Sequence, residues 1–149
     1  MRTIFRVITA SVICLVITAG LANAADLRAR LEGVWKMVRP STDAAGNPCP
    51  FVPESFDFRK DGTVIMSNMP PGMTARYRIA PAEDEAKAVA ARTGVNWKGK
   101  EMLLMMMGPG DDWAGRSMPY RYSIKGDELT LEVKDWSPSR FKRVRSGRR

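Results

Sequence analysis

Residues 120–133 read YRYSIKGDELTLEV, and apolar and polar side chains alternate through this stretch on both sides of a Gly-Asp turn. Apolar side chains recur at every second position, at Tyr120, Tyr122, Ile124, Leu129, Leu131 and Val133. This pattern is typical of a β-hairpin in which each strand buries one face and exposes the other. The stretch therefore predicts two adjacent antiparallel strands.

Other segments repeat the pattern. Phe56 and Phe58 alternate with polar residues up to a tight-turn sequence at residues 60–63, and an apolar run resumes at Val64. This predicts a second hairpin. Tyr77 and Ile79 alternate with arginines in a further strand. We therefore expect a mainly β protein.

Three more elements complete the expected domain. Residues 102–107 are apolar at every position, which predicts a strand covered on both sides or lining a cavity. A short last strand is expected around residues 140–144. One helix is predicted between strands, because Pro81 stands at a first-turn position, acidic residues follow it, and an Ala-rich run to Arg92 ends at Gly94.

The N-terminal segment has the features of a signal peptide. Arg2 and Arg6 precede an apolar run, and Ala22-Asn23-Ala24 supplies small residues for cleavage. We expect residues 1–24 to be removed, so that the mature chain is exported to the periplasm or secreted. Cys49 is then the only cysteine left, which excludes an intramolecular disulfide in the mature chain.

The basic character of the chain belongs to its C-terminal end. Without Arg2 and Arg6 the formal net charge falls from +8 to +6, and the last ten residues carry six positive charges. The rest of the domain is then formally neutral, which argues against a general nucleic-acid-binding body. The basic end, with residues 146–149 as a tail, is expected either to aid solubility or to attract an anionic membrane surface.

Two short phrases resemble the lipocalin-like, or calycin, group of small antiparallel β-barrels. They are Gly33-Val34-Trp35-Lys36 and the hairpin at residues 120–133. The resemblance implies a single up-and-down barrel of about eight strands over residues 25–145. In that group the Trp packs across the closed end of the barrel under an Arg from near the C-terminus, and the matching residue here is Arg143. Structural roles are thus implied for Gly33, Trp35 and Arg143.

The resemblance also implies a small hydrophobic ligand inside the barrel. We expect a monomer that binds it without covalent chemistry and without a cofactor. The strand pattern supplies the residues expected to line the interior: Phe56, Phe58, Tyr77, Met102, Leu104, Tyr120 and Tyr122. A different possibility is that the barrel is filled and that the protein is an inhibitor or another protein-interaction module.

The chain contains no histidine, which removes the commonest general base and the usual zinc ligand. Carboxylate catalysis through Asp111 and Asp112 stays open, but adjacent acids in a Gly-rich loop are more often a solvated turn. We therefore expect a protein that is not an enzyme.

Methionines suggest a different ligand class. Met66, Met69 and Met73 are closely spaced, and Cys49 could add a thiolate. Soft sulfur ligands without imidazole suit Cu(I) or Ag(I). The alternative is that these methionines fill a core or line an adaptable apolar pocket. The sequence leaves both alternatives open.

Overall fold

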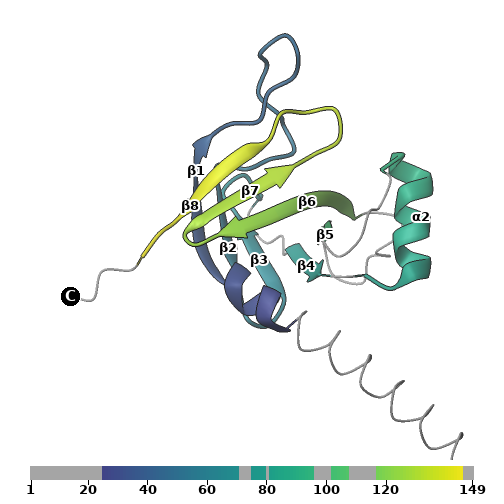
Figure 1. The fold of residues 1–149 in the computed structure, drawn as a ribbon, viewed down its shortest axis with the longest axis horizontal. Helices are drawn as coiled ribbons and strands as arrows, with labels where there is room; N and C mark the ends of the chain where they lie inside the picture. Colours follow the sequence, from purple (N-terminus) through teal and green to yellow (C-terminus); the bar gives the residue numbers. More distant parts are fainter. Residues whose placement is uncertain (1–24, 71–74, 80, 96–101, 108–116, 146–149) are drawn as a thin grey trace, which may run out of the picture.

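The computed structural model describes residues 25–70, 75–79, 81–95, 102–107 and 117–145, and within these ranges the chain forms a closed antiparallel β-barrel (Figure 1). Its eight strands pair in chain order, and the last strand returns to pair with the first. The strands are β1 (Gly33–Arg39), β2 (Ser55–Phe58), β3 (Thr63–Met66), β4 (Ala75–Ile79), β5 (Met102–Met107), β6 (Met118–Lys125), β7 (Glu128–Glu132) and β8 (Ser139–Arg143). The predicted fold class is confirmed.

Turn chemistry explains the hairpins. Between β2 and β3, the Asp61 carboxylate accepts a hydrogen bond of 2.9 Å from the Thr63 backbone N–H, and Gly62 adopts a positive φ of 86°. Between β6 and β7, Gly126 has a φ of 58°, and Lys125 pairs with Glu128. Left-handed backbone of this kind favours glycine. Both predicted hairpins are present.

The barrel interior is a dense apolar core. Side chains that point inward from neighbouring strands are almost completely buried, among them Trp35, Phe56, Phe58, Val64, Leu103, Leu129, Leu131 and Phe141. Full burial of one such side chain contributes roughly 1.5–3 kcal/mol. The fold is therefore stabilised by packing without a disulfide, since Cys49 is free.

A helix covers part of the outer wall. Helix α2 (Glu83–Thr93) ends at Gly94, whose φ is 67° and whose N–H donates to the Ala90 carbonyl. It lies outside the barrel beside β4, β5 and β6 (Figure 1), and Glu85 on the helix pairs with Arg78 on β4. Val89 and Leu104 are both fully buried, yet neither belongs to the interior cluster. The predicted inserted helix is present, and it lies on the side of the barrel formed by β4, β5 and β6.

Residues 25–31 form a helical segment that the sequence analysis did not anticipate. Leu31 is fully buried in the interior cluster, and Leu27 packs against it. Leucines four residues apart share one face of a helix, so the segment places an apolar stripe against one end of the barrel.

Several predictions lie outside the described residues. These are the signal peptide at residues 1–24, the tail at residues 146–149, and the acidic pair Asp111 and Asp112. Among the helices in the described ranges, none is long and apolar enough to cross a membrane.

Candidate functional site

One end of the barrel is closed by Trp35 and Arg143. The indole is fully buried, and its Nε1 donates a hydrogen bond of 2.7 Å to the Leu31 carbonyl. The Arg143 guanidinium lies over the indole, with its Cζ 4.2 Å from the ring centroid. This is the contact that the calycin resemblance implied.

The same guanidinium ties the N-terminal segment to the barrel. Arg143 donates hydrogen bonds to the backbone carbonyls of Arg30 and Glu32. Gly33 has a φ of 115°, and a Cβ built there would lie 3.1 Å from the Arg143 Nη1. A side chain at residue 33 would therefore meet backbone strain and a close contact together. The contacts of Trp35, Arg143 and Gly33 at this end are structural.

Aromatic side chains occupy the middle of the barrel. The rings of Phe56 and Phe58 stack with centroids 5.2 Å apart, and Phe56 meets Phe141 edge to face at 5.3 Å. Tyr77 meets Phe58 edge to face at 5.2 Å, and its hydroxyl donates to the Arg59 carbonyl. These rings contact one another, so Phe56, Phe58 and Tyr77 form a packed core.

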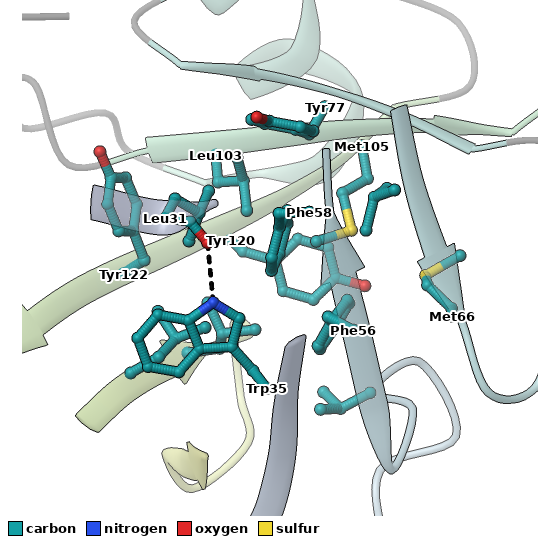
Figure 2. Close-up of a cluster of buried hydrophobic side chains, with 14 of the residues drawn as sticks. Leu31, Trp35, Phe56, Phe58, Met66, Tyr77, Leu103, Met105, Tyr120 and Tyr122 are labelled. Carbon is teal, nitrogen blue, oxygen red and sulfur yellow. Dashed lines mark hydrogen bonds between the residues drawn. The ribbon is translucent and has the colours of Figure 1, made fainter. Parts of the chain in front are cut away.

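A pocket of about 250 Å³ lies at the opposite end, which we call the mouth. The end of β3 at Met66, the start of β6 at Met118 and the start of β2 all lie at this end of the barrel. Gly33 and Arg143 lie at the other end. The pocket is lined by Pro50, Phe51, Met66, Asn68, Met105, Met118 and Tyr120. Figure 2 shows Met66, Met105 and the Tyr120 hydroxyl on one side of the core, away from Trp35.

Three strands bring the methionines of the mouth together. Met66 ends β3, Met105 belongs to β5 and Met118 begins β6. Met105 and Met118 are cross-strand partners, and all three side chains line the same pocket. Thioethers are polarizable and flexible, so this lining can adapt to an apolar ligand.

Tyr120 fixes the loop that borders the mouth. Its hydroxyl donates a hydrogen bond of 2.8 Å to the Phe51 carbonyl. Burial raises the pKa of the Tyr120 phenol, and the nearby Cys49 adds to this shift. At the base of the same loop, the Thr42 N–H donates to the Ser137 hydroxyl at 2.8 Å. Phe51 is half exposed at 49% and forms part of the rim.

The residues predicted to line the interior divide into three groups. Phe56, Phe58, Tyr77, Tyr120 and Tyr122 belong to the interior cluster, and of these only Tyr120 is among the residues lining the mouth pocket. Leu104 is buried outside that cluster, so the expectation that it faces the interior is corrected. The side chain of Met102 lies outside the described part of the chain.

The described residues cover only part of the sulfur set that the sequence predicted, so the set as a whole stays a prediction. Met66 lines the mouth, but the Met69 sulfur accepts a hydrogen bond of 3.4 Å from the Met66 N–H. Cys49 is buried in the core, and Met73 lies outside the described residues. Within the described ranges, no three His, Cys, Asp or Glu side chains gather to hold a metal ion.

Of the seven residues that line the pocket, the sequence analysis named only Met66 and Tyr120, and it placed neither Met105 nor Met118 there. Residues 102–107 are apolar on both faces, so periodicity alone could not tell which positions point inward. Continuing the alternation of Tyr120 and Tyr122 backward along β6 would have placed Met118 on the inner face. Pairing β5 with β6 would then have identified Met105.

No protein-family model, curated protein or solved structure matches this chain.

Proposed function

We propose that this chain is a non-catalytic, lipocalin-like protein that binds a small, mostly apolar ligand in the pocket at the mouth of its barrel. We also propose that it is exported, to the periplasm or beyond, after removal of residues 1–24. The observation that carries the ligand-binding proposal is the convergence of Met66, Met105 and Met118 from three strands on a single pocket.

The size of the pocket supports a small ligand. Its volume of about 250 Å³ is below the roughly 300–1,000 Å³ of sites for drug-sized molecules. It exceeds the roughly 150 Å³ of an apolar cavity that holds benzene. A compound of one or two rings therefore matches the space better than a long acyl chain, because aromatic side chains already occupy the barrel below the pocket.

The polar groups at the mouth are suited to orienting a bound ligand by hydrogen bonds and not to catalysing a reaction of it. Asn68 offers an amide at the rim, and the Tyr120 oxygen can accept a hydrogen bond while donating to Phe51. The chain has no histidine to act as a base or a metal ligand. These features favour binding without catalysis and without a cofactor.

The lipocalin-like relationship rests on the closed end. The strand order, the Gly33-Val34-Trp35 phrase and the guanidinium of Arg143 over the indole are the features that the group combines. A helix outside β4 to β6 is compatible with this relationship, because it leaves the order of strands unchanged.

A second candidate ligand is a soft cation such as Cu(I) or Ag(I). The specific observation in its favour is again the three thioethers of Met66, Met105 and Met118, which line one pocket. Thioether sulfur selects soft monovalent ions over zinc or Cu(II). A soft ion and an apolar molecule would use the same pocket. The ion would need the sulfur atoms as ligands, whereas the apolar molecule would need only the apolar volume.

Native mass spectrometry of the protein purified from the exported fraction tests both candidates, first without additions and then with naphthalene or Cu(I). The double variant Met105→Leu/Met118→Leu keeps the apolar volume and removes two sulfurs. Exchanges of this kind usually cost less than about 1.5 kcal/mol of stability. We expect the variant to retain the apolar compound with little change in affinity.

Each remaining result has a definite meaning. Loss of Cu(I) binding in the double variant, with binding retained in the control Met37→Leu outside the pocket, would establish the metal candidate. A protein that takes up neither probe would contradict the ligand-binding proposal and favour an interaction module with a filled barrel.

A further inference from the structure

Four cations face outward from the two strands that close the barrel. Lys36 and Arg39 lie on β1, Arg140 and Lys142 lie on β8, and all four side chains are exposed. The register places Lys36 directly opposite Lys142, and Arg39 directly opposite Arg140. Like charges opposite each other on neighbouring strands destabilise a sheet. The fold itself therefore does not require this arrangement.

These cations have no ion-pair partner among the described residues, whereas other exposed arginines do. Arg59 pairs with Asp57 at 3.4 Å, and Arg121 pairs with Glu132 at 3.8 Å. On the neighbouring strands, Lys36 has Ser55 opposite on β2, Arg140 has Thr130 opposite on β7, and Lys142 has Glu128. Glu54 shares a surface groove with Lys36. Asp127 and Glu132 also lie near Lys142 and Arg140, but they pair with arginines outside this set of four. The four cations therefore keep an excess of positive charge.

Exposed valines lie among these cations. The exposed fractions are 37% for Val34, 54% for Val38 and 42% for Val144. The Val144 N–H donates to the Val34 carbonyl at 2.8 Å, which places the two side by side. Val38 stands at a register shift between Met37 and Arg39, so it adds a residue to the outer face. We call Val34, Lys36, Val38, Arg39, Arg140, Lys142 and Val144 the β1–β8 face.

We propose that the β1–β8 face binds the surface of a membrane that contains anionic lipids. Lysine and arginine are attracted to anionic headgroups, and aliphatic side chains beside them gain from entering the interface. A nucleic acid or an acidic protein would attract the same cations, but the exposed valines favour lipid. In Figure 1, β1 and β8 lie together on one side of the barrel, and α2 lies on the other. The pocket at the mouth plays no part in this proposal.

Vesicle sedimentation tests the proposal with the full chain purified from the exported fraction. The protein is mixed with phosphatidylcholine vesicles that either contain or lack phosphatidylglycerol. We expect binding that requires phosphatidylglycerol and weakens with salt. Each cation at the surface contributes about fivefold in affinity, so Lys36→Gln/Lys142→Gln is expected to bind about 25-fold more weakly.

A matched control separates the face from net charge. Arg76→Gln/Lys87→Gln removes the same number of exposed charges from β4 and α2, far from β1 and β8 in the barrel order. We expect this control to bind nearly as well as the wild type. The test variant removes a repulsive pair, so its unfolding free energy should be unchanged or higher.

Three results would overturn the proposal. The first is no preference for anionic vesicles, which would leave an acidic macromolecule as the partner. The second is an equal loss of binding in the test and control variants, which would assign the effect to net charge. The third is loss of all binding on deletion of residues 146–149 while Lys36→Gln/Lys142→Gln binds normally.

Discussion

The two ends of this barrel are built from different kinds of contact. At the closed end, Trp35 is held by an indole hydrogen bond and by the Arg143 guanidinium, and the backbone at residue 33 favours glycine. At the mouth, flexible methionines and a half-exposed Phe51 surround a pocket, and a hydrogen bond from Tyr120 to Phe51 holds the bordering loop. Directional contacts fix one conformation, whereas thioethers adapt to what they touch. The closed end is therefore suited to stability and the mouth to binding.

The largest expected effect is at the closed end. Trp35→Ala removes a fully buried indole and leaves the Arg143 guanidinium without its ring. Truncation of a buried aromatic residue costs about 3–5 kcal/mol. We expect the free energy of unfolding to fall by this amount in a urea titration followed by far-ultraviolet circular dichroism.

Truncation at the mouth is the matched comparison. Met118 is only partly buried, so Met118→Ala should cost less than about 2 kcal/mol, below the usual range for a buried methionine. Equal losses in Trp35→Ala and Met118→Ala would break the distinction between the two ends.

A smaller effect is expected when only the cation is removed. Arg143→Gln loses the contact over the indole and the charged donors to the Arg30 and Glu32 carbonyls. The side chain is 23% exposed, so solvent screening limits the loss to about 1–2 kcal/mol.

Arg145→Gln is the control for Arg143→Gln, because Arg145 is 80% exposed and, within the described part of the chain, pairs only with Asp127 at the surface. Surface pairs of this kind contribute about 0–1 kcal/mol. If both substitutions shifted the urea midpoint equally, the guanidinium over Trp35 would have no special role.

Local alternation made most of the fold predictable. The hairpins at residues 55–66 and 118–132 follow from two-residue periodicity around Gly turns, and α2 follows from its acidic start and its Gly94 end. In β5 the periodicity was lost, because Leu103 is buried in the interior cluster and Leu104 is buried outside it. A helix packed outside a barrel makes both faces of a strand apolar, so sequence alone could not assign Leu104.

The pocket was less predictable than the fold because it depends on strand register. The dense methionine segment near Met66 drew attention to residues close in sequence. The mouth instead joins Met66 with Met105 and Met118, which are 39 and 52 positions further along the chain. Only the pairing of β5 with β6 brings the last two together. The resemblance implied a ligand inside the barrel, but it did not indicate which methionines line the mouth.

The last comparison concerns how the unfolding free energy depends on Tyr120 at alkaline pH. Burial raises the pKa of this phenol above its ordinary value of 10.0, and Cys49 adds to the shift. Above pH 10 the unfolded chain loses the Tyr120 proton while the folded protein keeps it. Stability from this group is therefore complete below pH 10 and falls above it, by up to about 1.4 kcal/mol per pH unit.

Tyr120→Phe separates this pH dependence from the hydrogen bond to Phe51. At neutral pH the variant should lose about 1 kcal/mol, because the Phe51 carbonyl loses its donor but lies near solvent. Between pH 10 and 11 its unfolding free energy should fall less steeply than that of the wild type. Tyr77, whose pKa burial also raises, still contributes to the slope in both proteins. Identical slopes would mean that Tyr120 ionises in the folded state, and the mouth would then be more open to water than its buried phenol indicates.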